Sequence, residues 1–536
     1  MFSFGAAMKI LTRGLRPRAG SSEAVPTADR ADGHGQGASL WRRRWLFCGL
    51  SAIAVQLGAL VAFSTLQYHR YALTRDFGAY SQAWWAIAHG HLNPYDTLFG
   101  APFWQNNAEF LMWPLALLYF PARSPLTLLV VQDLTVAVTE AIALCWALDV
   151  VSERFVRDDR VDDQAHANGI MGVALAAMLL DPWLYETTGF DVHFEPFTAL
   201  FCVLMGRSLW LRQFRWLWLW VPLALSTNVF GGLCVAALGL SAILAKRSVR
   251  TGSALVAAGL AWFFFVIALH GAGVGGTVIS TGYRYLTGGN SSNPFAIGVG
   301  LFTHPTAVWH LLSDRWVTAL AFVVVFGFVG VASRWALPIV AVVFLPSMLN
   351  SSGIFFRLLA SFQVWPALPF VLLGTVMLAS SWLDRGGRGK VPERAGVVLL
   401  GSWLAVTIAL AIPLLPSVWR TWIAVSPQAS AVLARDAVRI PANSELIASQ
   451  GVVGRFGDRT HVYPIMQPGR TYPLTGRPVY LLFAKDQGTG ELTAAATQVE
   501  ISFVQNRLRA TPLDSGSGIF LFEWNPASGR QSLLLP

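Results

Sequence analysis

The amino-acid sequence predicts an all-α polytopic membrane protein with about ten or eleven membrane-spanning helices. A small extracytoplasmic α/β domain is expected at its C-terminal end. Of the 536 residues, 54% are hydrophobic and 13% are charged, whereas soluble domains carry about 25% charged residues. The chain also has 22 tryptophans, and tryptophan favours the membrane–water interface. Apolar runs long enough to cross a bilayer recur along most of the chain.

The net charge of +10 would suggest a nucleic-acid partner for a soluble protein. Here the basic residues lie mostly in short segments between apolar runs, a pattern typical of membrane topology and lipid-headgroup contact. We therefore expect membrane lipid, and no nucleic acid, as a partner. The four cysteines lie within apolar segments and form no close pair in the sequence, so neither a disulfide framework nor a zinc site is expected.

Residues 1–40 are polar, and we expect a disordered cytoplasmic tail there. The first span is predicted at 45–66, directly after a run of arginines. A twin-arginine secretion signal is the alternative, but the apolar run is long, shows no small-residue cleavage site and is followed by further spans. We expect the protein in the plasma membrane. The positive-inside rule then predicts that its N-terminus lies in the cytoplasm.

The polytopic domain is predicted to cover 41–415. Its further full spans are expected at 126–150, 170–183, 197–211, 254–269, 316–331, 335–349, 358–378 and 397–415. A short interfacial helix is expected at 110–120. The stretch 216–245 is too long for one simple span, and a polar run ending at Asn228 interrupts it, so a hairpin of two short helices is predicted there.

In this arrangement every loop on the inner side carries Arg or Lys, as the positive-inside rule requires. Two large segments, 67–109 and 271–314, then lie on the outer side. The region from 416 to 536 also lies outside, where the runs VYLLFAKDQ and IFLFEWNP predict strands of the α/β domain.

The first outer segment is the richest in polar and aromatic side chains. Arg75 and Asp76 lie just beyond the end of the first span, and Gln82 and Trp85 follow on an amphipathic run. A carboxylate at a membrane surface, beside aromatic and amide groups, can bind a sugar hydroxyl or act as a general base. The simpler interpretation is an Arg–Asp ion pair and an aromatic anchor that hold an interfacial helix.

A second group of polar side chains occurs in the sequence GFDVHFEPF. Asp191, His193 and Glu195 alternate there, which is one way to bring two or three ligands to a divalent metal ion. The other interpretation is that one acid points inward and the others are solvated. No fourth ligand or helix-spaced histidine pair is evident, so no metal ligand is assigned.

Other polar residues lie at predicted membrane edges. Glu109 and Asn228 are candidates because polar groups at membrane depth are costly to keep. Tyr283, Arg284 and Arg357 would lie outside, against the charge bias. Arginines in such places can bind phosphate through paired hydrogen bonds, or contact lipid headgroups.

Four stretches carry a resemblance to a known family. They read RDFGAYSQAWWAIAHG, PLTLLVVQDL, TTGFDVHFEPF and VRIPANSELIASQGVVGRFGDRTHVYP. In this order they resemble a large family of prokaryotic polytopic membrane proteins with a domain of unknown function. That family is itself similar to the C-type glycosyltransferases, which act on lipid-linked sugars.

The resemblance implies an inverting glycosyltransferase of the cell envelope that uses a polyprenyl-phosphate sugar and a glycan, lipid or protein acceptor. By position it implies Asp76 as the catalytic base and Asp191 with His193 as a second motif. The chain departs from the family pattern at three places. Glu109 stands near an expected histidine, Ser226–Asn228 replaces a Lys-Glu-Asp run, and Gln363 stands at an expected His-Tyr element.

Two other classes of protein stay open. One is a transporter or flippase for a lipid-linked glycan, since a broken hairpin is typical of transporter helices. No internal repeat and no run of ionisable residues through the predicted spans supports it. The other is a catalytically silent membrane binding protein, which the three departures favour.

Overall fold

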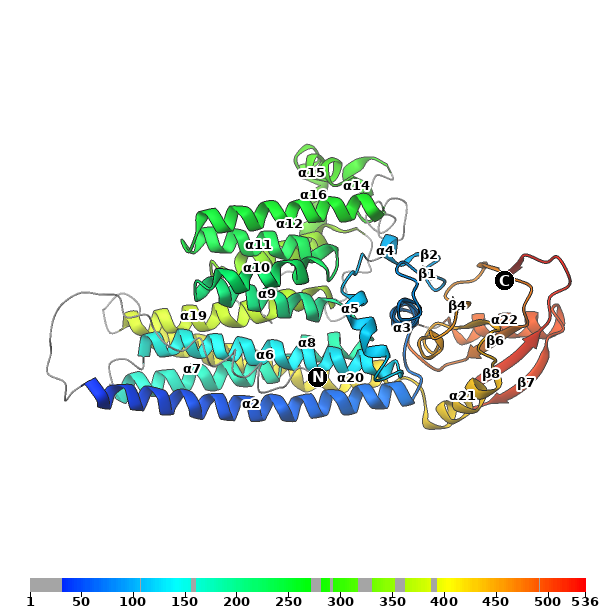
Figure 1. The fold of residues 1–536 in the computed structure, drawn as a ribbon, viewed down its shortest axis with the longest axis horizontal. Helices are drawn as coiled ribbons and strands as arrows, with labels where there is room; N and C mark the ends of the chain where they lie inside the picture. Colours follow the sequence, from blue (N-terminus) through cyan, green and yellow to red (C-terminus); the bar gives the residue numbers. More distant parts are fainter. Residues whose placement is uncertain are drawn as a thin grey trace.

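The structure is a computed structural model in which long helices form a bundle and a mixed α/β domain sits against one end of it (Figure 1). It describes residues 31–106, 108–155, 161–270, 281–289, 293–316, 330–351, 362–386, 393–490 and 492–536. The predicted tail at 1–40 therefore lies mostly outside the described residues, and its last ten residues are helical.

Six described helical segments are long and apolar enough to cross a membrane, and a seventh arises if one bent pair counts as a single span. The bundle contains α2 (Ala31–His69), α6 (Leu126–Phe155), α7 (Val161–Leu179), α8 (Pro182–Gly189), α9 (Glu195–Trp210), α10 (Phe214–Leu225), α11 (Val229–Leu244), α12 (Val249–His270), α18 (Leu337–Leu349), α19 (Leu368–Gly386) and α20 (Glu393–Trp422). Three of these, α10, α11 and α18, are apolar but shorter than a full span. The described residues thus contain six or more apolar spans of the predicted polytopic bundle, and parts of the spans predicted at 316–331 and 358–378 lie outside the described residues.

The hairpin predicted at 216–245 is confirmed as α10 and α11. The chain breaks at Ser226–Asn228, and the Asn228 side chain accepts a hydrogen bond from the Gly231 amide, which caps the start of α11. Asparagine is a favoured N-cap because its oxygen satisfies an amide that the first helical turn leaves free. The same polar run that interrupts the apolar pattern in the sequence thus starts the second helix.

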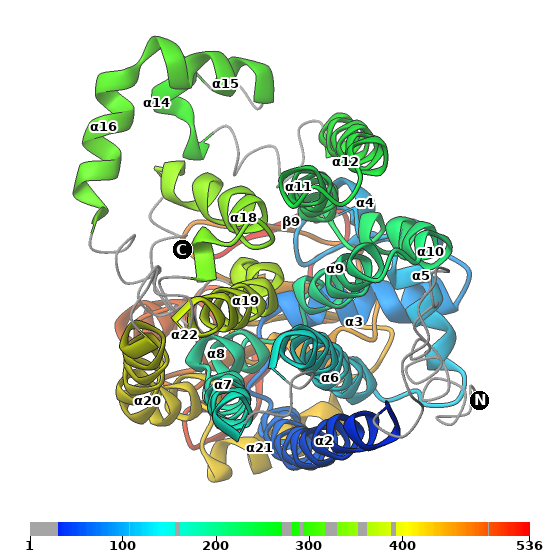
Figure 2. The same cartoon turned by 90° about the vertical axis from the view of Figure 1, so that its left-hand side faces the viewer.

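Glycines let α11 and α12 approach closely (Figure 2). A Cβ added to Gly232 would lie 2.8 Å from the Gly259 carbonyl oxygen, and one on Gly239 would lie 2.5 Å from the Gly252 oxygen. Helices in a bilayer associate largely by such close packing of small residues, since lipid is as apolar as the side chains. This pair therefore forms a firm hairpin at the side of the bundle.

Several predicted boundaries are wrong. The span predicted at 126–150 is longer, because α6 extends to Phe155. The span predicted at 170–183 begins earlier, because α7 starts at Val161, and α8 follows it closely, so the loop before α9 is short. The span predicted at 358–378 lies further along, since η5 (Phe362–Ala367) leads into α19.

The last bundle helix also runs further than predicted. α20 continues through Pro413 and Pro416 and ends at Trp422, so the boundary with the C-terminal domain lies after residue 416. Proline is tolerated within membrane helices, where neighbouring groups satisfy the carbonyls that it frees. A proline that would end a helix in a soluble protein is a poor marker of a boundary here.

The second large outer segment is also more regular than predicted. It contains α14 (Arg284–Thr287), α15 (Pro294–Thr303) and α16 (Pro305–Asp314), and η3 (Gly330–Ala332) follows. The apolar helices α15 and α16 meet at 89°. Residues 271–280 and most of the predicted span at 316–331 lie outside the described residues.

The first outer segment forms a layer between the bundle and the C-terminal domain (Figure 1). Its main element is α3 (Arg75–Ala88), most of whose residues are buried. The smaller elements are β1 (Tyr95–Asp96), β2 (Ala101–Pro102), α4 (Phe103–Asn106), α5 (Met112–Ala116) and η2 (Leu117–Tyr119). The last two correspond to the interfacial helix predicted at 110–120.

The C-terminal domain is a five-stranded mixed sheet in the order β4-β3-β6-β8-β7. Its elements are α21 (Pro427–Arg439), β3 (Glu445–Ser449), η6 (Val453–Phe456), β4 (Val462–Ile465), β5 (Thr471–Pro473), β6 (Val479–Ala484), α22 (Ala494–Asn506), β7 (Thr511–Gly516), β8 (Ile519–Trp524) and β9 (Ser532–Leu534). Strand β3 pairs in parallel with β4 and β6, whereas β8 runs antiparallel to β6 and β7. The two strands expected from VYLLFAKDQ and IFLFEWNP are β6 and β8.

Each face of this sheet has its own apolar core. α22 covers one face through Ile501 and Val504. The other face packs on α21 and on residues of the first outer segment, including Tyr71 and Leu98. Because those residues complete the core of the C-terminal domain, the domain and the first outer segment form one packed unit.

Glycines bring the backbone of η6 against α3. A Cβ added to Gly454 would lie 2.5 Å from the Thr74 carbonyl oxygen, and one on Gly457 would lie 2.5 Å from the Gly78 oxygen. The Gly454 amide also donates to the Leu73 carbonyl at 3.0 Å. Only glycine leaves room for two backbones at this separation, so the domain docks by main-chain contact.

Replacing Gly454 with alanine should therefore weaken the docking of the domain by about 1–3 kcal/mol, because the added methyl group overpacks the contact. The midpoint of thermal unfolding in detergent micelles should fall, and proteolysis between α20 and α21 should become faster. Gly401→Ala is the matched control, since a Cβ at that position meets nothing within 4 Å. Equal behaviour of the two variants would contradict this account of docking.

Candidate functional site

The candidate site lies where α3 meets the short loop 190–194, at the end of the bundle that faces the C-terminal domain (Figure 1). The Asp191 carboxylate accepts hydrogen bonds from the Thr74 amide at 3.0 Å, from the Thr74 hydroxyl and from the Phe77 amide at 3.3 Å. The two motifs that the sequence singled out, around Asp76 and around Asp191, are thus brought into direct contact.

Asp76 occupies the first turn of α3. Thr74 caps this helix by accepting a hydrogen bond from the Asp76 amide at 3.2 Å. The Asp76 side chain is 23% exposed, and its Oδ1 lies 3.5 Å from Nε of Arg75. Burial raises the pKa of the Asp76 carboxyl above its usual value, and the nearby Arg75 charge opposes this only in part. Asp76 is therefore a fixed and partly accessible carboxylate with increased basicity.

Arg75 reaches from α3 to the C-terminal domain. Its Nη1 lies 2.7 Å from Sδ of Met466, and its guanidinium lies 4.6 Å from the centre of the Phe99 ring. A thioether is a weak acceptor, and the side chain is 27% exposed. The guanidinium therefore has donors available for an anion beside Asp76.

Asp191 has a left-handed backbone, with φ of 51°. This conformation is uncommon for residues other than glycine, although aspartate adopts it more readily than most. The turn aims its fully buried carboxyl at the start of α3. Burial raises the pKa of Asp191 to about 7, whereas the hydrogen bond from the Thr74 side chain lowers it.

His193 is buried beside this turn. Its amide donates to Gln132 Oε1 at 2.7 Å, and Gln132 Nε2 donates to the Asp191 carbonyl at 2.9 Å. The imidazole stacks on the Phe190 ring with 4.9 Å between centres. Burial lowers the pKa of His193 to about 3, so the ring is neutral at physiological pH and serves to position the loop.

A second polar group extends from α3 to the tip of the α10–α11 hairpin. The Tyr80 hydroxyl donates to Glu109 Oε1 at 2.9 Å, and Asn228 Nδ2 donates to Glu195 Oε1 at 3.2 Å. Burial raises the pKa of Tyr80 well above its usual value, and the charges of Glu109 and Glu195 raise it further. Glu109 and Asn228 therefore belong to the packed surroundings of the site.

Other predicted site residues lie elsewhere or have structural contacts. Gln82 is buried, and its Nε2 donates to Thr97 Oγ1 at 3.0 Å and to the Arg459 carbonyl at 2.7 Å. Its Oε1 accepts from the Thr97 amide at 2.9 Å. Gln82 therefore helps to dock the C-terminal domain, and its role in substrate binding stays a prediction.

The remaining four residues are Trp85, Tyr283, Arg284 and Arg357. The Trp85 ring is half-buried and its centre lies 5.0 Å from that of the His89 ring. The Tyr283 hydroxyl donates to the Pro346 carbonyl at 2.7 Å, so this side chain ties α14 to α18. Arg284 is exposed on α14, and Arg357 lies outside the described residues.

No group of three or more metal-ligating side chains occurs within the described parts of the chain. Asp191 is directed at the amides of α3, and Glu195 contacts Asn228. Asp191 and Glu195, which alternate with His193 in the sequence, therefore contact different partners.

Sequence reasoning missed Thr74, Tyr80 and Gln132. A threonine two residues before an acidic residue at a helix start is an N-cap signal, so Thr74 was detectable. Tyr80 follows Asp76 by four residues and shares its helix face. Gln132 is a polar residue within an apolar span, which is a functional or structural candidate by default.

The fold and the site define a multi-pass membrane protein with a cluster of acidic residues at one end of its helical bundle. Residues 66–507 match the family model described as a predicted membrane protein, DUF2079. The chain belongs to this family. No curated protein matches it.

Among solved structures, the chain is similar to ArnT from Cupriavidus metallidurans bound to undecaprenyl phosphate. The TM-score is 0.45 at 12% identity, covering 89% of this chain and 98% of that chain. For the apo state of ArnT the TM-score is 0.44 at 13% identity, with 87% and 97% covered. Likenesses this distant assign no activity to this chain.

Asp191 and His193 should affect the stability of the protein with opposite dependence on pH. From pH 7 down to 3.8 the folded state gains a proton on Asp191 that the unfolded state lacks, so stability rises as pH falls. Below pH 6.5 the unfolded state gains a proton on His193 that the folded state excludes, so stability falls. Each contribution changes by at most about 1.4 kcal/mol per pH unit.

Thermal unfolding in micelles across this range can separate the two contributions. Relative to wild type, the His193→Gln variant should gain stability as pH falls, because it lacks the excluded proton. The Asp191→Asn variant should lose stability relative to wild type over the same range. Parallel curves for both variants and wild type would show that neither group titrates as described.

Proposed function

We propose that the protein is a membrane glycosyltransferase that moves a sugar from a polyprenyl-phosphate donor to an acceptor hydroxyl at the outer face of the membrane. The class of donor comes from the sequence resemblance to C-type glycosyltransferases. The observation that carries the proposal concerns the Asp76 carboxylate. It lies in the first turn of α3, it is partly exposed, and its pKa is raised.

A general base needs a suitable pKa and access to the proton that it removes. Asp191 and Glu109 are buried and accept hydrogen bonds from protein donors. Asp76 differs, since its ion pair with Arg75 at 3.5 Å leaves the carboxylate partly accessible. Within the described site it is therefore the acid best suited to remove a proton from an acceptor.

Arg75 is suited to bind the donor phosphate. Its guanidinium lies beside Asp76 and contacts a weak sulfur acceptor and an aromatic ring. Arginine binds phosphate oxygens through paired N–H groups. We assign the phosphate contact to Arg75 because it shares the site with the base, whereas Arg284 lies on the separate element α14.

In the proposed reaction, Asp76 accepts the proton of the acceptor hydroxyl as its oxygen attacks the anomeric carbon. The bond between that carbon and the phosphate oxygen breaks, and the electron pair leaves with the lipid phosphate, whose charge Arg75 stabilises. Direct attack inverts the configuration at the sugar carbon. Asp191 and His193 hold the start of α3, and with it Asp76, in position.

The charge distribution supports an outer location for this site. The turn between α11 and α12 lies at the bundle end away from the C-terminal domain (Figure 1). Basic residues occur in this turn, in the turn between α9 and α10, and near the start of α2 and the end of α6. They include Arg42, Arg43, Arg44, Arg154, Arg212, Arg215, Lys246, Arg247 and Arg250. The positive-inside rule places that end in the cytoplasm, so the site and the C-terminal domain face outward.

Replacing Asp76 with asparagine should lower sugar transfer by about 10²–10⁴-fold, the usual contribution of a general base. The rate of wild type should rise with pH through the raised pKa of Asp76, since the base must be ionised. Transfer of radiolabelled sugar from polyprenyl-phosphate donors, measured in membranes expressing each protein, tests both expectations.

The matched control for this assay is Asp458→Asn, which removes an exposed carboxylate on the adjoining surface of the C-terminal domain. It should leave transfer unchanged. Transfer that persists in Asp76→Asn would remove Asp76 as the base.

A transporter of lipid-linked glycan is the second candidate, and one observation favours it. α6 carries three buried acids, Asp133, Glu140 and Asp149, so the sequence-based view that the spans lack a series of ionisable residues is wrong. Donor binding without transfer by wild type, together with movement of the lipid across vesicles, would favour this candidate.

A further inference from the structure

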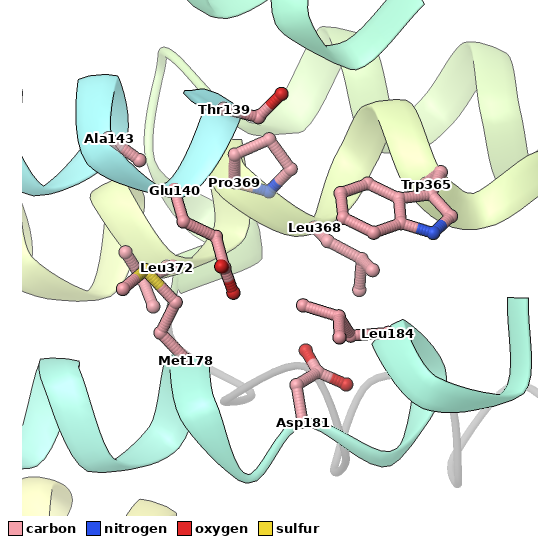
Figure 3. A pocket seen from close by; sticks show the side chains of 10 residues that line it. All are labelled: Thr139, Glu140, Ala143, Met178, Asp181, Leu184, Trp365, Leu368, Pro369 and Leu372. Carbon is pink, nitrogen blue, oxygen red and sulfur yellow. The ribbon is translucent and has the colours of Figure 1, made fainter. Parts of the chain in front are cut away.

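The proposed reaction releases a lipid phosphate with close to two negative charges, and this charge needs basic partners. A cavity of about 40 Å³ lies inside the bundle between α6, α8 and α19, but none of its lining residues is basic (Figure 3). The side chains of Glu140 and Asp181 project into it instead. This cavity does not suit an anion, and the phosphate is better matched to the site that holds Arg75 and Asp76.

The turn between β4 and β5, residues 466–470, brings a second arginine to that site. Nη1 of Arg75 lies 2.7 Å from Sδ of Met466, the first residue of the turn. Arg470 is the last residue of the turn, and its Nη1 donates to the Pro464 carbonyl at 3.3 Å. Arg75 of α3 and Arg470 of the C-terminal domain therefore contact the same short stretch of chain from opposite sides of the domain interface.

The C-terminal domain holds the Arg470 side chain in place. The guanidinium lies 5.5 Å from the centre of the Tyr472 ring, and the buried Tyr472 hydroxyl donates to the same Pro464 carbonyl at 3.3 Å. The Leu535 amide donates to the Arg470 carbonyl at 3.2 Å, which fixes the backbone of the turn. Arg470 is half-buried, and within the described parts of the chain it forms no ion pair with a carboxylate.

The two guanidinium groups are close enough to affect each other. Burial lowers the pKa of Arg470 below its usual value, Tyr472 opposes this change, and the positive charge of Arg75 lowers the pKa further. Like charges held near each other are unfavourable unless a negative charge lies between them. Asp76 forms its ion pair with Arg75, at 3.5 Å, so the positive charge of Arg470 is left for a ligand.

Asp96 is a further acid near Arg75, but it has a different role. It is 2% exposed, and its Oδ1 accepts hydrogen bonds from the Leu98 and Phe99 amides at 2.9 Å and 3.2 Å. Burial raises the pKa of Asp96 to about 7, although these amides and the Arg75 charge lower it. Asp96 therefore stabilises its own turn and does not replace a phosphate beside Arg470.

We propose that Arg75 and Arg470 together bind the phosphate of the lipid donor, so that the C-terminal domain supplies one half of the phosphate site. This inference rests on the proposed function and adds a substrate-binding residue to it. Each guanidinium presents paired N–H groups that match phosphate oxygens. The β4–β5 turn then has a second task besides packing, since it sets the distance between the two arginines.

The charges in the reaction explain why a second arginine is needed. Before transfer, the donor phosphodiester carries one negative charge and Asp76 carries another, and the two arginines match both. During transfer Asp76 takes the acceptor proton and becomes neutral, while the leaving lipid phosphate gains its second negative charge. Arg75 then loses its ion-pair partner, and both arginines face the phosphate. Arg470 therefore stabilises charge that develops during the reaction, which is the kind of interaction that raises a rate.

Binding of polyprenyl phosphate to the purified full-length protein in micelles tests this inference separately from sugar transfer. Arg470→Gln should weaken binding by about 10–100-fold, the usual loss for a hydrogen bond to a charged group. Arg470→Lys should lose less, because it keeps the charge. Phosphatidylglycerol, a lipid phosphodiester with one negative charge, should be affected less than polyprenyl phosphate. Arg477→Gln is the matched control, since it removes an exposed arginine from the next turn of the same domain, and it should bind as wild type does.

The outcomes separate this inference from the proposed function. Equal binding of polyprenyl phosphate by Arg470→Gln and wild type would overturn the inference. Equal losses in Arg470→Gln and Arg470→Lys, with a lower unfolding midpoint in both, would show a structural role and also overturn it. Equal losses for both lipids would assign Arg470 to phospholipid headgroups instead. Weaker binding in Arg470→Gln alone, with no sugar transfer by wild type, would support the phosphate site and reject the glycosyltransferase.

Discussion

The hydrogen bonds from the first turn of α3 to the Asp191 carboxylate are the constraint on which the end of the molecule nearest the C-terminal domain depends. They join two segments that enter the structure from different spans, and they leave Asp191 fully buried. The same helix carries Asp76 on its first turn and receives the C-terminal domain along its side. The buried carboxylate of Asp191 thus determines where the candidate base and the docking surface lie. This role accounts for the left-handed backbone of Asp191.

Much of the bundle was predictable because apolar length and polar interruptions act locally. The hairpin break at Asn228 is the clearest example, since one residue both interrupts the apolar run and caps α11. The ends of helices were harder to predict. α20 passes through Pro416 because a bilayer imposes continuity on helices where water would not. A short helix such as α18 has the composition of a span without its length, so composition alone does not separate full spans from short helices.

The candidate site was predictable where its residues are close in sequence or unusual for a membrane. Asp76 and Asp191 were found because acids at membrane edges are rare. The contact of Gln82 with the C-terminal domain could not be predicted, because its partner Arg459 lies 377 positions away and no local pattern reveals such a bond.

The docking of the C-terminal domain on α3 also has a consequence for biogenesis. Synthesis proceeds at about 5–20 residues per second, so the 377 residues between Gln82 and Arg459 correspond to a delay on the order of twenty to seventy-five seconds. During that time α3 has left the ribosome without its partner, and residues such as Leu98, which complete the core of the later domain, are uncovered. The nascent chain must therefore keep an apolar surface shielded at the membrane until its last quarter is made, which creates a need for a chaperone or for the lipid interface itself.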